Sequence, residues 1–169
     1  TLEVHKESAI FEVGVGYGES LKVLSNNGYK NLSGCEMSDD RVSIARKLLP
    51  GNKIFNGGYQ NSKKKFDFVY ANHVVEHLYT PSHFFKWCVD SANNPKELIV
   101  AIAVPNAKFE PLITQIYFLP HLHSFTELSL RQLGLEHDMV SFLCQAEGIR
   151  PDDMVYVFVH KDNKSAQSK

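Results

Sequence analysis

The chain of 169 residues is long enough for one domain, and a domain of this size buries about two thirds of the surface that its unfolded form exposes. Hydrophobic residues make up 43% of the sequence and charged residues 22%, which excludes the disordered and fibrous classes. The formal net charge of -1 provides no overall basic field, so we do not expect nucleic acid as a substrate.

Short apolar runs with few charges have the character of strands buried on both faces of a parallel sheet. They are residues 9–13, 31–35, 66–71 and 98–104. Helical patterns separate most of them, which implies βαβ units with right-handed crossovers. The sequence therefore predicts a doubly wound α/β fold with a mostly parallel sheet and helices on both faces.

Three helices are expected between these strands. The first carries Leu21 and Leu24 and ends at Asn27-Gly28, where both residues tolerate a left-handed cap. The second begins after Ser38 or Asp39 and stops at Pro50-Gly51. The third runs from about Ser82 to Ala92, and we expect Trp87 to pack or to face a groove rather than to bind a cofactor. The predicted core-facing residues of the second and third helices are Ile44, Ala45, Leu48 and Leu49, then Phe84, Phe85, Cys88 and Val89.

The end of the chain changes character. Two β-rich runs, residues 138–144 and 154–160, have no room for a helix between them, so we expect an antiparallel hairpin. We assign residues 1–160 to one domain and expect the polar residues 161–169 to be a disordered tail.

The cysteines and apolar runs indicate the compartment. Cys35, Cys88 and Cys144 are odd in number and lack C-x-x-C spacing, which favours a reducing compartment over disulfides or a thiolate zinc site. Apolar runs fall short of the ~18 residues of a membrane span, and the first residues lack the order of a signal peptide. We expect a cytoplasmic protein without a membrane partner. The sequence does not indicate its oligomeric state.

A glycine loop follows the first predicted strand and opens directly into a helix. Residues 12–18 read Glu-Val-Gly-Val-Gly-Tyr-Gly. Glycine permits positive φ and lets a ligand lie against the backbone, and the N–H groups of the helix start face that ligand. Open α/β sheets bind ligands at this position, where the winding reverses.

Two acidic residues favour a particular ligand for this loop. Glu36 follows the second predicted strand, where a carboxylate accepts hydrogen bonds from both ribose hydroxyls of a nucleoside. The dinucleotide pattern G-x-G-x-x-G needs a glycine at position 19, which is Glu19 here. Glu12 would repel a pyrophosphate but suits a cationic sulfonium and amino group. The spacing and charge favour S-adenosylmethionine over NAD.

These motifs resemble those of the class I S-adenosylmethionine-dependent methyltransferases, in particular the small-molecule branch of ubiquinone-pathway and sugar methyltransferases. Four blocks carry the likeness: residues 11–18, 34–36, 66–78 and 104–106. The resemblance implies a Rossmann-like fold with a seven-stranded sheet. It also implies transfer of a methyl group from S-adenosylmethionine to a small-molecule acceptor, leaving S-adenosylhomocysteine. Members usually carry a helix before the first strand, so we expect that an amino-terminal portion of the parent protein is missing.

The resemblance also implies which residues contact the cofactor. Glu12 and the glycines line the methionine part, Glu36 holds the ribose with Met37 beside the adenine, and Asn72 and His73 close the pocket. Many members have an Asp after the third strand where this chain has Gly57-Gly58-Tyr59, so adenine recognition rests on backbone atoms or neighbouring side chains. The implied cofactor-binding residues are Glu12, Gly14, Gly16, Gly18, Glu36, Met37, Gly58, Tyr59, Asn72 and His73.

Residues 73–77 match H-x-x-E-H, a zinc peptidase signature that requires a helix. Because His73 directly follows a buried strand and Pro81 comes soon after, we expect no metal here. A helix starting near Val75 would place Glu76 in its first turn, where an acid stabilises the helix dipole without any chemistry.

The connection from Pro105 to Ser124 is long and apolar, which is typical of a lid or a binding loop. We expect it to form the acceptor side of the site, with a short packed helix as the alternative. Histidine is the natural base near neutral pH, and the candidate catalytic residues are His77, His121 and His123. A dinucleotide-dependent oxidoreductase and a catalytically silent cofactor-binding domain are the alternative functions.

Overall fold

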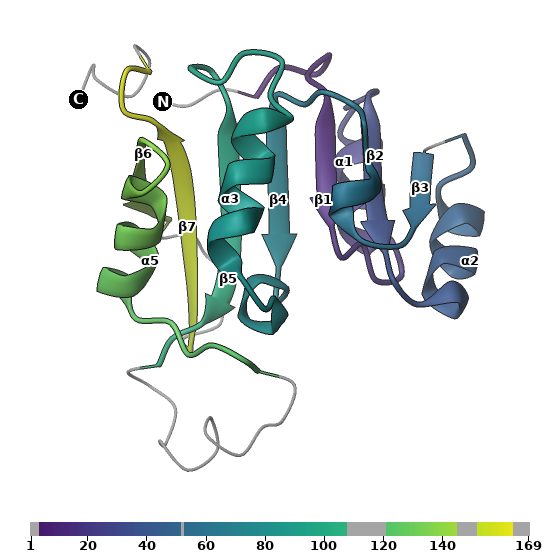
Figure 1. Ribbon diagram of the computed structural model, residues 1–169. Coiled ribbons are helices and arrows are strands. Elements are labelled where there is room, and N and C mark those ends of the chain that lie inside the picture. The colour runs from purple at the N-terminus through teal and green to yellow at the C-terminus, as the bar shows by residue number, and fades with distance from the viewer. Residues whose placement is uncertain (1–3, 52, 108–120, 145–151, 164–169) are drawn as a thin grey trace.

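The computed structural model describes residues 4–51, 53–107, 121–144 and 152–163. They form one seven-stranded sheet in the order β3-β2-β1-β4-β5-β7-β6. The strands are β1 (Ile10–Val13), β2 (Leu32–Glu36), β3 (Lys53–Asn56), β4 (Phe68–Asn72), β5 (Ile99–Pro105), β6 (Met139–Leu143) and β7 (Asp153–His160). The first five are parallel, and β7 pairs antiparallel with both β5 and β6. The predicted parallel sheet and the carboxyl-terminal hairpin are therefore confirmed (Figure 1).

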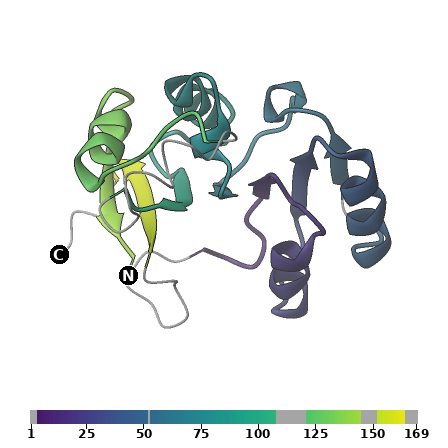
Figure 2. The same ribbon diagram turned by 90° about the horizontal axis from the view of Figure 1, so that it is seen from below.

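Helices cover both faces of the sheet. The helices α1 (Glu19–Asn26) and α2 (Asp39–Leu48) bury Leu21, Val42 and Ala45 in one apolar cluster. The helices α3 (Pro81–Asp90) and α5 (Glu127–Leu135) contribute Phe84, Phe85, Cys88 and Leu130 to a second, larger cluster. Figure 2, seen along the strands, shows α3 and α5 on the opposite side of the sheet from α1. The doubly wound arrangement is thus confirmed.

The second helix differs from its predicted packing. Its start at the N-cap Ser38 and its end before Pro50-Gly51 are as expected. However, Ile44 and Leu48 are 45% and 37% exposed, and Val42 is buried in their place. Because α2 packs beside β3 at the edge of the sheet, only a narrow stripe of the helix is covered. The apolar stripe that was read from the sequence was therefore too wide.

Trp87 packs as predicted from the sequence. Its ring lies in an aromatic cluster with Phe11, Tyr59, Phe66 and Phe84. Of the four strands predicted from apolar runs, each begins or ends within two residues of its predicted bounds. The edge strand β3 was not among those runs, because only Ile54 of its four residues is buried.

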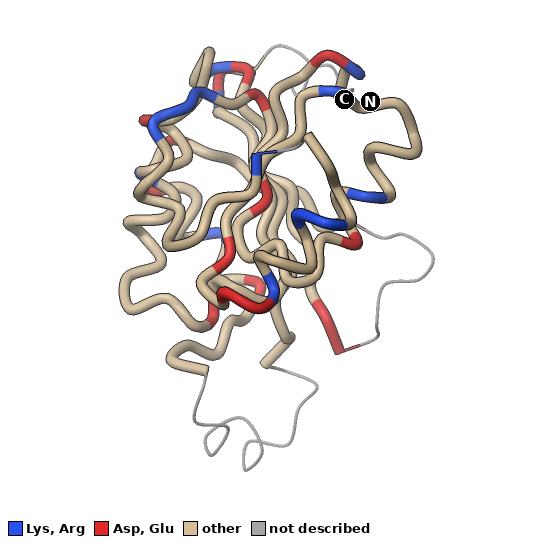
Figure 3. Tube along the Cα trace, turned by 90° about the vertical axis from the view of Figure 1, so that its right-hand side faces the viewer, with Lys and Arg blue, Asp and Glu red and all other residues tan. Residues whose placement is uncertain are grey.

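Charges of both signs are mixed over the fold. Figure 3 shows Lys and Arg interspersed with Asp and Glu along the tube. Among the described residues, no helix combines the length and apolar character that a membrane span needs. Residues 164–169 of the predicted tail and residues 145–151 of the hairpin connection lie outside the described residues.

Candidate cofactor and acceptor site

The candidate site lies where the winding of the sheet reverses. The chain winds outward from β1 through β2 to β3, then returns to β4 on the other side of β1. The parallel strands point to one edge of the sheet, the lower edge in Figure 1, and the loops after β1 and β4 meet there. Ligands of open α/β sheets bind at such a crevice. The topology therefore places the glycine loop and the segment after β4 side by side.

The glycine loop joins β1 to α1 with left-handed backbone at Gly14, Gly16 and Gly18. A Cβ at Gly14 would lie 2.5 Å from Cγ2 of Val74, in the segment after β4, so this glycine allows the two loops to pack together. A Cβ at Gly16 would meet no atom within 4 Å. Of these two glycines, Gly16 faces open space, as a backbone that contacts a ligand must.

Glu36 anchors the loop from the end of β2. Its Oε2 accepts a hydrogen bond from the Gly16 N–H at 3.1 Å. Its Oε1 accepts from the N–H groups of Met37 and Ser38 at 2.9 and 3.0 Å. A carboxylate oxygen accepts more than one bond, so the same side chain can hold the loop and still accept from a ligand hydroxyl. The sequence predicted only the second of these two roles.

Gly34 allows β1 and β2 to lie close beneath the loop. A Cβ there would be 2.3 Å from Cγ1 of Val15 and 2.6 Å from the backbone oxygen of Glu12. The contact with backbone cannot be relieved by a rotamer change. We therefore expect Gly34→Ala to lower the free energy of unfolding by about 1 to 3 kcal/mol, the range of overpacked cores.

Urea unfolding of wild type and Gly34→Ala measures this difference through the shift in midpoint at constant slope. The wild type is the reference, because Gly34 is not among the glycines with a positive φ and its replacement carries no left-handed strain. A Gly34→Ala protein as stable as the wild type would contradict the close approach.

Glu12 is a buried acid within the sheet, opposite Gly34 of β2 and Tyr70 of β4. Its side chain is 2% exposed, and its Oε2 has no hydrogen-bond partner. Burial raises the pKa of the Glu12 carboxyl to about 7, although the hydroxyls of Tyr70 and Ser20 lower it. An unpartnered buried oxygen is costly, and a cationic group of a ligand would supply the missing partner.

The turn after β3 and the residue after β2 complete this side of the site. The N–H of Gly57 donates to the backbone oxygen of Glu36 at 2.9 Å, which brings the turn next to the second strand. The ring of Tyr59 is 4% exposed and packs against Phe84 and Trp87. Met37 is 79% exposed. The turn thus presents backbone rather than the Tyr59 ring, and Met37 offers an uncovered apolar surface.

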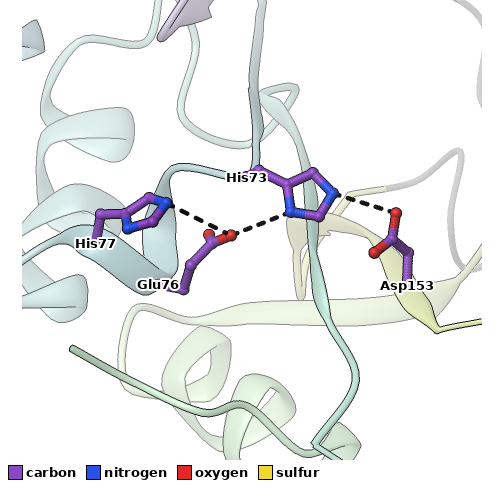
Figure 4. A network of polar contacts seen from close by, with 4 residues as sticks. All are labelled: His73, Glu76, His77 and Asp153. Carbon is purple, nitrogen blue, oxygen red and sulfur yellow. Dashed lines mark hydrogen bonds and ion pairs between the residues drawn. The ribbon is translucent and has the colours of Figure 1, made fainter. Parts of the chain in front are cut away.

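The segment after β4 is held by a hydrogen-bonded relay. Asn72 is exposed at the end of the strand, and His73 has a positive φ of 53°. The His73 ring lies between two carboxylates, with Nδ1 3.2 Å from Oε1 of Glu76 and Nε2 3.2 Å from Oδ2 of Asp153 (Figure 4). The hydrogen bond to Glu76 and the charge of Asp153 raise the pKa of His73. The sequence missed Asp153, because it lies 80 residues further along the chain.

Glu76 does not occupy the first turn of an α-helix, as the sequence suggested. Val75, Glu76 and His77 form a single 3₁₀ turn, η2 (Val75–His77), before α3 begins at Pro81. The residue before a proline avoids the α region, so the turn does not continue into the helix. The Glu76 side chain is 1% exposed and points at His73 and His77 instead of capping a helix end (Figure 4).

His121 and His123, which follow β5 in the chain, lie beside the turn η2. The backbone oxygen of Glu76 accepts from the N–H groups of Leu122 and His123 at 2.8 and 3.1 Å. This clamp brings the rings of His77 and His121 to a centroid distance of 4.8 Å. The His123 ring stacks on Phe125, with a buried Nε2 that has no partner. Residues 108–120 of the predicted lid lie outside the described residues.

Comparisons with known proteins concern the family and the fold of the chain. Residues 11–92 match a family model described as a methyltransferase domain. No curated protein sequence matches the chain.

Three solved structures share the fold at low sequence identity. The plantazolicin methyltransferase BpumL, in complex with a triazolic desmethylPZN analog and SAH, has a TM-score of 0.72 and 15% identity over 89% of this chain and 76% of its own. Magnesium protoporphyrin IX methyltransferase from Synechocystis PCC 6803 with bound SAH has a TM-score of 0.67 and 13% identity over 91% of this chain and 74% of its own. An S-adenosylmethionine-dependent methyltransferase from Mesorhizobium loti has a TM-score of 0.74 and 12% identity over 91% of both chains.

Proposed function

We propose that the chain is a class I S-adenosylmethionine-dependent methyltransferase that transfers a methyl group to a small-molecule acceptor. The match of residues 11–92 to a family model described as a methyltransferase domain supports this proposal. The observation that carries this proposal is the pairing of an open glycine backbone with two buried acids. Gly16 faces open space, Glu36 lies within hydrogen-bond distance of it, and Glu12 has an unpartnered oxygen in the adjoining strand. Together, the Gly16 backbone and the carboxyl groups of Glu36 and Glu12 offer hydrogen-bond partners to the polar groups of an adenosyl amino acid.

Each of these residues has a distinct task in the proposed complex. The Glu12 carboxylate would take the amino group of the methionine part, because a cation offsets the cost of a buried negative charge. Glu36 would accept from the ribose hydroxyls while it holds the loop. Met37 and the backbone of Gly57 and Gly58 would lie against the adenine. The site excludes a pyrophosphate for the same electrostatic reason, which argues against a dinucleotide.

The acceptor side would be built by the segment after β4 and by residues 121–125. Held by Glu12 and Glu36, the cofactor would supply an activated methyl group, whose carbon would bond to an acceptor lone pair while the electron pair of the carbon–sulfur bond stays on the sulfur. The protein chiefly aligns the reactants, and alignment supplies about 7 to 11 kcal/mol of such a barrier. Asn72, which is exposed at the end of β4, and His73 would close this side around the reacting atoms.

Small molecules are the favoured acceptors for two reasons. BpumL was solved with a desmethylPZN analog, and the Synechocystis enzyme is named for magnesium protoporphyrin IX. The formal net charge of -1 provides no overall basic field that would concentrate a polyanion. Incubation with S-adenosylmethionine and a panel of small acceptors, followed by detection of S-adenosylhomocysteine, tests the activity. Calorimetric titration with S-adenosylhomocysteine and with NAD separates this function from an oxidoreductase.

A variant of Glu36 tests the proposed ribose contact. We expect Glu36→Ala to weaken S-adenosylhomocysteine binding by about 1 to 3 kcal/mol, because hydroxyls lose a charged acceptor. Part of this loss would come from the loop, since three N–H groups also lose their acceptor.

An analogue without the two ribose hydroxyls separates these contributions. Calorimetry should show that the wild type prefers the complete ligand, and that Glu36→Ala loses most of this preference. If the preference is the same in both proteins, Glu36 only holds the loop.

A further inference from the structure

The three side chains of Glu76, His77 and His121 point to a use that the sequence did not predict. Each offers one ligand atom, and these atoms all lie within 4.8 Å of one another. Atoms that bind one zinc ion, at about 2.0 to 2.2 Å from it, are about 3 to 3.5 Å apart. Small rotations of two half-buried histidines would close the remaining gap.

Glu76 provides independent evidence that a partner is missing. Its carboxylate is 1% exposed, and only Oε1 is engaged, by His73 and at 4.0 Å by His77. The other oxygen, Oε2, is buried without a hydrogen-bond partner. A buried carboxylate requires partners on both oxygens or a compensating charge, and a cation meets this requirement.

The surroundings hold this carboxylate in place. His73 contacts Glu76 with one ring nitrogen and Asp153 with the other, so a relay fixes the orientation of Glu76 from behind (Figure 4). Such outer contacts are typical of metal ligands. The backbone oxygen of Glu76 also receives the N–H groups that bring His121 to the turn. The same residue thus supplies one ligand and positions another.

From these contacts we infer that Glu76, His77 and His121 bind a divalent first-row transition-metal ion. Two imidazoles and one carboxylate suit Zn²⁺, Co²⁺, Mn²⁺ and Fe²⁺, and three protein ligands leave coordination positions open. This arrangement differs from the zinc peptidase motif, which would use His73 and His77 on one helix. His73 has a left-handed backbone and lies between two carboxylates, so it does not share the helical face that this motif needs.

The site lies beside the glycine loop, since Val74 of the same segment packs against Gly14. If the proposed methyl transfer is correct, on which this consequence rests, an open position would bind an oxygen of the acceptor. A metal-bound hydroxyl loses its proton to water more readily than a free one. The acceptor class is then a molecule with a hydroxyl group that coordinates the ion. His77 and His121 would act as ligands rather than as bases.

Cobalt provides a direct test. The chain is freed of metal with a chelator and titrated with Co²⁺, whose visible absorption reports histidine and carboxylate coordination. We expect saturation at a single ion per chain, and displacement of the colour by Zn²⁺. The variants Glu76→Gln, His77→Asn and His121→Asn should each weaken binding at least about tenfold, the lower range for disturbed metal sites.

His83→Asn is the matched control, because His83 is an exposed histidine on the nearby helix α3. It should bind Co²⁺ as the wild type does. Should Glu76→Gln fail to fold, as a buried side chain allows, the two partly exposed histidines still decide the matter. Titration without saturation, or equal binding by wild type, His77→Asn and His121→Asn, overturns the metal site.

Measurements of Co²⁺ and S-adenosylhomocysteine binding on the same variants test the metal site and the proposed methyltransferase function separately. His121→Asn should lose Co²⁺ but retain S-adenosylhomocysteine binding by calorimetry. Gly16→Val should lose S-adenosylhomocysteine but retain Co²⁺. If the chain binds Co²⁺ and no adenosyl ligand, the methyltransferase proposal fails and the metal site stands. The reverse result removes only the metal site.

Discussion

Gly16→Val is expected to abolish S-adenosylhomocysteine binding while the fold remains formed. The Gly16 backbone has a φ of 53° and donates its N–H to Glu36. A β-branched side chain is disfavoured in this left-handed region. Because a Cβ there meets no protein atom within 4 Å, it would project into the space assigned to the ligand. We expect the affinity to fall at least about 100-fold, or about 2.8 kcal/mol.

A second glycine separates backbone strain from lost ligand contact. Gly28 follows α1 with a φ of 88°, and a Cβ there also meets no atom within 4 Å. Gly28→Val therefore carries a similar conformational cost outside the candidate site. Both variants should lose about 1 to 2 kcal/mol of stability, but only Gly16→Val should lose the ligand in calorimetry. If a natively folded Gly16→Val protein binds S-adenosylhomocysteine normally, the glycine loop is only a turn and does not contact the ligand.

The sequence predicted those features of this protein that depend on neighbours along the chain. Alternation of apolar runs with helical patterns predicted the parallel sheet, because buried strands and amphipathic helices have different periods. The spacing of the glycines and Glu36 predicted a ligand site at the start of α1. Both the apolar patterns and the spacing of the glycines and Glu36 involve residues that are near one another in the chain, so they can be recognised without the structure. In the structure the Gly16 N–H donates to Glu36, while the contacts of both residues with a cofactor stay a prediction.

Features built by distant residues were not accessible in this way. Asp153 reaches His73 only because β7 runs antiparallel beside β5. His121 reaches His77 through two hydrogen bonds to the backbone of Glu76, which no side-chain pattern records. The burial of Glu76 likewise follows from packing between loops. The residues of the H-x-x-E-H match do not lie on one α-helix, as expected from the sequence. The cluster of Glu76, His77 and His121 depends on residues far apart in the chain, so the sequence did not predict it.

The free energy of unfolding should depend on pH through Glu12. Burial raises the pKa of this carboxyl to about 7 in the folded chain, compared with 4.5 for the free group. The folded state therefore holds a proton that the unfolded state has lost between these pH values. Stability from this group is fully present below pH 4.5 and disappears as the pH rises through about 7. The full difference amounts to about 3 kcal/mol.

Glu12→Gln isolates this contribution, since glutamine does not ionise and retains the size of the side chain. Relative to the wild type, the variant should gain about 3 kcal/mol between pH 4 and pH 8, whatever constant offset the amide introduces. Urea unfolding of both proteins across this range measures the difference, in which other ionisable groups largely cancel. A constant difference would mean that the Glu12 carboxyl ionises alike in the folded and unfolded chain.

The same titration with saturating S-adenosylhomocysteine connects this acid to its proposed ligand. A cationic amino group beside Glu12 favours the ionised carboxylate and lowers its pKa. The ligand should then bind more tightly above pH 7 than below it, and binding near pH 6 should release a proton from the protein. Calorimetry in buffers of different ionisation enthalpy counts that proton, and Glu12→Gln should not release it. If the wild type binds without proton release and with equal affinity on both sides of pH 7, the amino group lies elsewhere, and the unpartnered oxygen of Glu12 serves another purpose.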